Sequence, residues 1–147
     1  MGKRRCGPAI AMLCLAMMPP YVGAPRAAAL QSARVALPAT PQGALAAEYV
    51  RTFNSGDESA MLTLMRERGT DAMRARRTDD ERLKTFHQLR ERLGTVEVAD
   101  VTIAEPIRLD FVVVSQTGPR AIYTMTFDTS TPPRFDSISV EIRIPER

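Results

Sequence analysis

The stretch EYVRTFNSGDESAMLTLM, residues 48–65, carries two amphipathic helical patterns on either side of a short polar corner, FNSGD. Apolar residues recur at helical spacing on both sides, which predicts one helix over 43–54 and a second over 58–66. In the corner, Ser55 and Asp57 are candidate caps for the second helix, because a short oxygen-bearing side chain accepts hydrogen bonds from free N–H groups. Gly56 allows a positive φ, and Asn54 tolerates one. The corner is therefore interpreted as structural. The alternative, a catalytic Asp57, has no partner base nearby.

The helical pattern continues as far as residue 93. Gly69 ends the second helix, and residues 70–77 form a short helical turn. The sequence from Thr78 to Glu81 has the form of a capping box, with a hydroxyl at the cap and a carboxylate three residues later. Gly94 marks the end of the third helix. The apolar stripe of this helix consists of Leu83, Phe86, Leu89 and Leu93.

Beyond Gly94 the pattern becomes that of β-strands, over residues 95–103, 107–116, 120–128 and 135–144. The apolar phase slips between Val98 and Val101, which predicts a bulge. Helices followed by a four-strand meander predict an α+β domain, with N-terminal helices packed on an antiparallel four-stranded sheet. The last strand alternates, with one apolar face made of Ile138, Val140, Ile142 and Ile144.

The N-terminus has the composition of a secretory signal peptide. A basic segment, Lys3 to Arg5, precedes an uncharged apolar run from Cys6 to Met18 that is too short to span a bilayer. Small residues at 27–29 offer a cleavage site before Leu30, and residues 22–24 are a second candidate. We therefore predict a signal peptide over 1–29, a flexible lead over 30–42 and a single domain over 43–147. The expected location is periplasmic or secreted, with no membrane anchor after cleavage.

Removal of residues 1–29 changes the charge of the chain. The full sequence has 20 Lys and Arg against 17 Asp and Glu, a net charge of +3. Four basic residues and no acidic residue lie within 1–29, so the remaining chain has 16 − 17 = −1. The near-zero net charge of the remaining chain argues against a nucleic-acid partner. Both cysteines also lie within 1–29, so the predicted mature domain has no disulfide and no thiol nucleophile.

Three groups of residues together resemble a known family. They are the corner FNSGD (53–57), the helix end LRERLG (89–94), and the pair Pro132-Pro133 followed by the alternating last strand. Over roughly Pro41 to Pro145 the chain resembles the small nuclear-transport-factor-2-like (cystatin-like) domain of secreted bacterial proteins. The resemblance implies a curved antiparallel sheet wrapped around helices, forming a cone with a pocket. Such domains often precede a β-lactamase-like serine hydrolase or a tail-specific peptidase. Relatives include isomerases, dehydratases and binding modules, among which the fold does not choose.

Asp110 and Tyr123, with Tyr49, are the candidates for acid–base chemistry in such a pocket. A buried carboxylate beside a tyrosine donor performs proton abstraction in the isomerases of this fold. The alternative is structural, with Asp110 facing water and Tyr123 as an aromatic residue of the core or the pocket wall. The candidate pocket wall consists of Tyr49, Phe53, Tyr123, Met125 and Phe127.

Other reactive groups are sparse. His87 is the only histidine of the chain, and no metal-ligand spacing or serine-hydrolase elbow occurs, so we expect no metal and no cofactor. Residues 66–92 hold nine basic and six acidic residues, interspersed as is typical of solvated helix faces. Within them, Arg74, Arg76 and Arg77 are candidates for an anion-binding or docking edge.

These patterns favour an exported, non-catalytic binding or accessory module. The alternative is a small pocket enzyme that performs acid–base chemistry of the isomerase or dehydratase type. Three helices cover only one face of a four-stranded sheet, so Val112, Val114 and Ile122 are expected to form an apolar patch on the other. We expect a homodimer through that face, or docking onto an exported serine hydrolase or peptidase.

Overall fold

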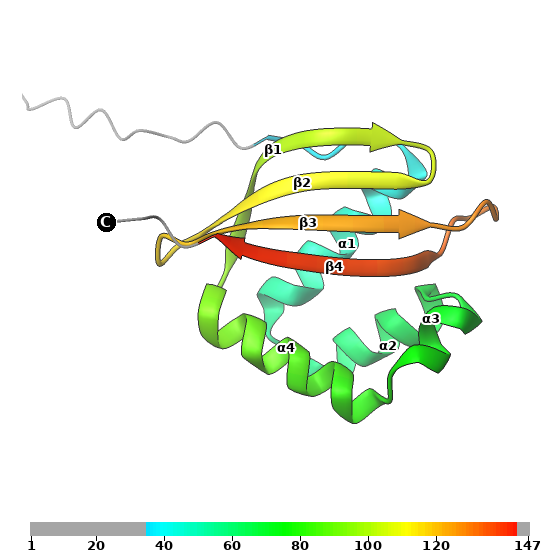
Figure 1. Cartoon of the computed structure of the whole chain (residues 1–147), viewed down its shortest axis with the longest axis horizontal. Coiled ribbons are helices and arrows are strands. Elements are labelled where there is room, and N and C mark those ends of the chain that lie inside the picture. The colour runs from blue at the N-terminus through cyan, green and yellow to red at the C-terminus, as the bar shows by residue number, and fades with distance from the viewer. Residues whose placement is uncertain (1–34, 144–147) are drawn as a thin grey trace, which may run out of the picture. The chain divides into compact units, whose positions relative to one another are not determined.

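The computed structural model describes residues 35–143 (Figure 1). The predicted signal peptide, the first part of the predicted lead and Ile144 lie outside the described residues. Within 35–143, four helices precede four strands, which confirms the predicted α+β class. No helix in this range is long and apolar enough to cross a membrane. The helices are α1 (Pro41–Ser55), α2 (Glu58–Arg68), α3 (Asp71–Arg76) and α4 (Asp79–Leu93); the strands are β1 (Val96–Glu105), β2 (Arg108–Ser115), β3 (Arg120–Phe127) and β4 (Phe135–Arg143).

The strands form an antiparallel meander in the order β1-β2-β3-β4, so β1 and β4 are its edges. Alternate residues of β2 and β3, such as Phe111 and Tyr123, are buried beneath the helices. Their neighbours Val112 and Ile122 pair across the strands on the opposite, uncovered face. In Figure 1 the helices lie behind the sheet and along its β4 edge. The register of β1 shifts between Val98 and Asp100 and again after Val101, which confirms the predicted bulge.

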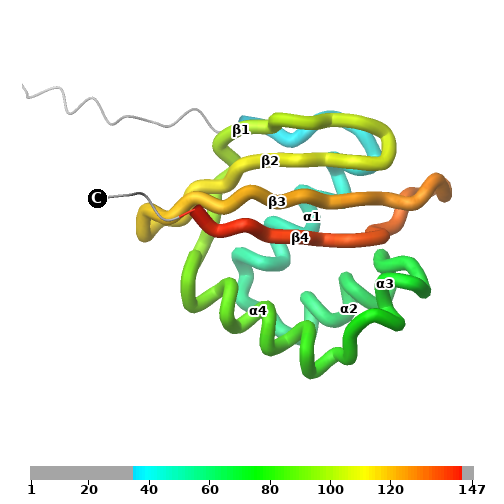
Figure 2. The backbone as a smooth tube through the Cα atoms, viewed as in Figure 1, coloured from blue at the N-terminus to red at the C-terminus, as the bar shows by residue number. Residues whose placement is uncertain are grey.

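The chain is ordered against the sheet before the first helix begins. Val35 N–H donates to Val98 O at 3.4 Å, and the following residues run beside β1 (Figure 2). Thr40 caps α1 by accepting from Gly43 N–H at 3.1 Å, so this helix begins two residues before the predicted position 43. A Cβ on Gly43 would lie 1.9 Å from Pro38 O, so only glycine fits this close approach. The predicted lead therefore includes packed residues from 35 onward.

The corner between α1 and α2 is held by hydrogen bonds of Ser55 and Asp57. Asp57 is the N-cap of α2, and its carboxylate accepts from Ala60 N–H at 2.9 Å. Ser55 was predicted as a cap and is not one, because it is the last residue of α1 and its hydroxyl donates to Thr52 O at 2.7 Å. Gly56 has φ +72°, as a left-handed helix end requires. The Asn54 side chain points away from the corner and hydrogen-bonds the backbone of β1.

Helix α4 contacts the other side of this corner. Its predicted capping box is confirmed, with Thr78 and Glu81 exchanging side-chain and backbone hydrogen bonds. At its other end, the Arg90 guanidinium donates to Gly94 O at 3.0 Å and lies over the Phe53 ring, 5.6 Å from the centroid. The segment LRERLG (89–94), which carries part of the family resemblance, therefore contacts the FNSGD corner through Arg90.

The core is aromatic, and every phenylalanine of the chain is buried in it. Tyr49 on α1 contacts the Tyr123 and Phe135 rings edge-on, at centroid distances of 5.8 and 6.2 Å. The Phe111 and Tyr123 rings stack at 5.4 Å on adjacent strands. Ile107, predicted as part of the second strand, lies instead in the turn before β2 and is 53% exposed. Its position is outside the core because the β2 ladder begins only at Arg108.

Candidate functional site

A cavity of about 480 Å³ opens between β4 and the helices α2, α3 and α4. Its volume is in the range of small-molecule sites. It exists because β4 is an edge strand whose helix-facing side chains are only partly covered, in contrast to those of β2 and β3. Its lining consists of Tyr49, Met61, Met65, Met73, Arg76, Arg77, Arg82, Thr85, Phe86, Leu89, Asp136, Ser137, Ile138, Ser139 and Val140.

The body of this cavity is apolar. Its apolar lining comes from three elements: Ile138 and Val140 of β4, Met61 and Met65 of α2, and Leu89 of α4. Methionine side chains are unbranched and polarizable, so they adapt to apolar ligands of varied shape. The sequence placed these methionines on a helical core stripe, and helical spacing alone does not separate a core residue from a cavity residue.

Three arginines meet at one end of the cavity, beside Asp136. The Arg82 side chain is 13% exposed and is fully engaged, with Asp79 at 3.1 Å and the carbonyl oxygens of Met73 and Arg74. Arg76 donates to Asp136 O at 3.1 Å, and its guanidinium is 3.9 Å from the Asp136 carboxylate. The predicted cluster of Arg74, Arg76 and Arg77 is therefore divided. Arg74 binds Asp71 and Arg66 O away from the lining, and only the other two reach the cavity.

Asp110 and Tyr123 do not share a cavity, so the predicted acid–base pair is wrong. The register pairs Phe111 with Tyr123 and Asp110 with Thr124, which places the carboxylate on the uncovered face and the phenol on the helix face. A one-residue step along a strand always changes the face. Both Asp110 oxygens are held by Arg108, at 3.0 and 2.7 Å. The Asp110 side chain is only 9% exposed, since this guanidinium covers it.

Tyr49 and Tyr123, which were predicted to approach one cavity together with Asp110, are in ring contact at a centroid distance of 5.8 Å. Burial raises the pKa of the Tyr49 hydroxyl well above its usual range, and burial together with neighbouring Tyr49 does the same for Tyr123. Both phenols therefore stay protonated near neutral pH. Tyr49 lines the cavity, while Tyr123 is 1% exposed and its hydroxyl has no hydrogen-bond partner among the described residues.

The remaining candidates for the pocket wall lie in the core. Phe53, Met125 and Phe127 are buried and do not line the cavity, so Tyr49 is the one member of the predicted wall that does. The wall is built instead by α2, α4 and β4, because the cavity lies at the β4 edge and not over the centre of the sheet. The corner residues 54–57 are likewise absent from the lining.

His87 is on the surface of α4. Its Nε2 is 3.4 Å from a Glu58 carboxylate oxygen, and its side chain is 56% exposed. In the range 35–143 no group of three or more potential metal-binding side chains occurs.

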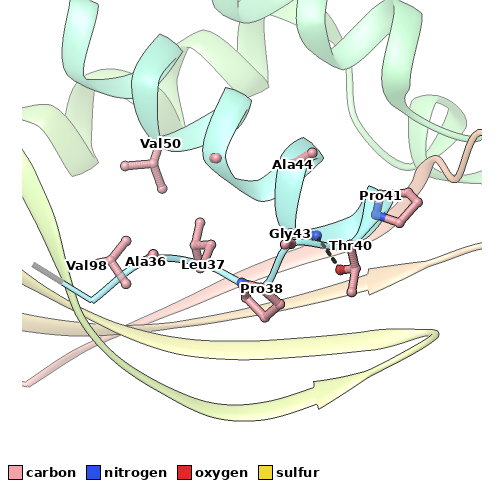
Figure 3. A pocket seen from close by; sticks show the side chains of 11 residues that line it. Ala36, Leu37, Pro38, Thr40, Pro41, Gly43, Ala44, Val50 and Val98 are labelled. Carbon is pink, nitrogen blue, oxygen red and sulfur yellow. Dashed lines mark hydrogen bonds between the residues drawn. The ribbon is translucent and has the colours of Figure 1, made fainter.

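A second hollow, of about 640 Å³, lies between residues 36–41 and α1 (Figure 3). Its lining is apolar except for Thr40, whose hydroxyl already accepts from Gly43 N–H. Leu37 and Val50 point into it from opposite sides, and Val98 of β1 lies at one end. Its lining includes no charged group for recognition. The β4 cavity is therefore the better candidate site.

Comparison with protein families, with curated proteins and with solved structures gave no match for this chain.

Proposed function

We propose that this chain is an exported, non-catalytic binding module that holds a small ligand in the β4 cavity. The observation that carries the proposal is the cavity itself, with an apolar body and a cationic end, on the helix-covered side of the sheet. The nuclear-transport-factor-2-like (cystatin-like) identity, with its curved, cone-shaped sheet, is part of this proposal. Its support is the order of helices before a four-strand meander and the corner built by residues 53–57.

A binding role is favoured over acid–base catalysis by the positions of the candidate groups. The Asp110 carboxylate is turned away from the cavity and is paired with Arg108. Burial raises the pKa of Tyr49, the tyrosine that does line the cavity, so its phenol stays protonated near neutral pH and is not available as a base. Neither Asp110 nor Tyr123 lines the cavity, and the carboxylate that does, Asp136, is shared with Arg76.

Export is a further part of the proposal, and it rests on the N-terminal sequence alone. Mass spectrometry of the periplasmic or secreted product should find an N-terminus near Leu30. Recovery of an uncleaved protein from the cytoplasm would contradict the proposed export.

Binding in the cavity is tested with a neutral apolar dye, Nile red, titrated against the wild type and two tryptophan variants. Ile138→Trp fills the cavity from β4, whereas Ile107→Trp adds the same bulk in the exposed turn before β2, away from the cavity. We expect the dye affinity to fall at least about tenfold in Ile138→Trp and to be unchanged in Ile107→Trp. Circular dichroism establishes that both variants are folded. A wild type that binds no dye, or a folded Ile138→Trp that binds as well as the wild type, would overturn the proposal.

A further inference from the structure

The β4 cavity is polar at one end and apolar at the other. Helix α4 and strand β4 both begin beside α3 and run in the same direction (Figure 1). Along α4 the lining residues change from Arg82 and Thr85 to Phe86 and Leu89. Along β4 the lining begins with the charged Asp136 and continues with polar and apolar residues in alternation, namely Ser137, Ile138, Ser139 and Val140. The charged residues of both walls therefore lie where α4 and β4 begin, at the α3 end of the cavity.

At the polar end, Arg77 forms no close ion pair with a described residue, although its charge, after the hydrogen bonds from Thr78, helps to lower the pKa of Glu81. The only hydrogen bond of Arg77 within residues 35–143 is a long one, 3.5 Å from Nη1 to Thr85 Oγ1. No Asp or Glu carboxylate in that range lies within ion-pair distance of it. Arg82 is neutralised by Asp79, and Arg76 shares Asp136. The lining itself contains three arginines against one aspartate, so the polar end retains positive charge.

We propose that the cavity binds an amphipathic anion, a molecule with one carboxylate group and an aliphatic body. The carboxylate pairs with the Arg77 guanidinium, whose planar array of N–H donors matches two carboxylate oxygens. Arg76, which shares Asp136, also lines this end of the cavity. The aliphatic body lies along Met61, Met65 and Leu89 and replaces water on apolar surface. This inference rests on the proposed function and names the ligand class of that same cavity.

The alternative is that Arg77 is an ordinary solvated surface arginine, since other exposed arginines within residues 35–143 also have no ion pair there. Arg92, on the surface of α4, is one of these and does not line the cavity. What distinguishes Arg77, which is exposed as well, is that it lines the cavity beside an apolar body, where it can meet the charged end of a bound ligand. Arg92 therefore provides the matched control for Arg77.

The test compares decanoate with 1-decanol by isothermal titration calorimetry, on the wild type, Arg77→Gln and Arg92→Gln. The two probes have the same aliphatic chain and differ in the charged group. We expect the wild type to bind decanoate at least about tenfold more tightly than decanol, and Arg77→Gln to lose that preference. Decanol affinity should be the same in all three proteins. The decanoate affinity should also fall as salt is added.

The outcomes separate this inference from the proposed function. If decanoate and decanol bind the wild type equally, the anionic ligand class is wrong while the cavity still binds ligands. If the preference for decanoate survives in Arg77→Gln, or is lost equally in Arg92→Gln, the assignment of the carboxylate to Arg77 is wrong. If neither probe nor Nile red binds, both the inference and the proposed function fail.

Discussion

The Asn54 side chain hydrogen-bonds both backbone groups of Val96, with Nδ2 donating to the carbonyl oxygen at 2.8 Å and Oδ1 accepting from N–H at 2.9 Å. An asparagine at the end of α1 thus imitates a strand partner for the first residue of β1, 42 residues later in the chain. The Val96 side chain is buried, so neither backbone group has ready access to water. Asn54 was predicted only as a residue that tolerates a positive φ in the corner, and it also makes this long-range contact.

Asn54→Ala is expected to lower the free energy of unfolding by about 2–4 kcal/mol, because it leaves a buried N–H and a buried C=O of Val96 unpaired. Urea denaturation followed by circular dichroism measures the change. Ser55→Ala is the control, since its hydroxyl is exposed and bonds only within the corner; it should cost well below about 1 kcal/mol. Equal losses in the two variants would contradict this role for Asn54.

Asp57→Ala should cost about 1 kcal/mol, the usual effect of removing a helix N-cap. For a domain of this size the melting temperature falls by a few degrees, roughly 3–6 °C. Asp57→Asn keeps an oxygen acceptor at the same position and should recover most of the loss. An Asp57→Ala protein as stable as the wild type, but unable to bind its ligand, would mean that the residue is functional.

Gly43→Ala is expected to destabilise the protein, although alanine is favoured over glycine in a helix by about 1 kcal/mol. The new methyl group would meet Pro38 O at 1.9 Å, so residues 35–40 must move away from α1 (Figure 3). Overpacking of this kind costs about 1–3 kcal/mol. The reverse substitution at the next position, Ala44→Gly, is the control, because Ala44 is exposed and should show the ordinary helix preference. A Gly43→Ala variant with a higher melting temperature would contradict the close approach.

Tyr123→Phe should leave the stability at neutral pH unchanged or raise it by about 1 kcal/mol, because it removes a buried hydroxyl that has no partner among the described residues. The two proteins should differ more above pH 10. The raised pKa of Tyr123 keeps it protonated in the folded state, while an unfolded tyrosine loses its proton near pH 10. The unfolded state then binds fewer protons, so wild-type stability falls as the pH rises, and this contribution is absent from the phenylalanine variant. Urea denaturation between pH 8 and 11 measures both slopes; parallel curves would contradict the prediction.

We retain the proposal that the uncovered face of the sheet forms a homodimer. Val112 and Ile122 pair at its centre, and both charge signs surround them, with Arg120 and Glu141 among the rim residues. A face that carries both signs is able to match a second copy of itself across a two-fold axis. Sedimentation should show a wild-type dimer and a folded monomer for Val112→Glu plus Ile122→Glu. Ala72→Glu plus Ala75→Glu, on exposed α3, adds equal charge elsewhere and should stay dimeric. A monomeric wild type at high concentration, with no partner recovered by cross-linking, would remove the proposal.

The sequence by itself determined the helices and strands, because their signals are local. The capping box at Thr78, the left-handed turn at Gly56 and the alternation of the strands each depend on residues within one or two turns of chain. It also located the slip in β1, since a bulge shifts the side-chain alternation within a single strand.

The candidate site was decided by the tertiary structure. Asp110 and Tyr123 are each plausible pocket residues in the sequence, yet only the pairing register between β2 and β3 shows that they face opposite sides of the sheet. The methionines of α2 have the spacing of a core stripe, and they border a cavity only because β4 is an edge strand that the helices leave partly uncovered. Arg77 differs from Arg92 because it lines this cavity and Arg92 does not. Its surroundings are set by segments far apart in the chain, which residue spacing does not encode.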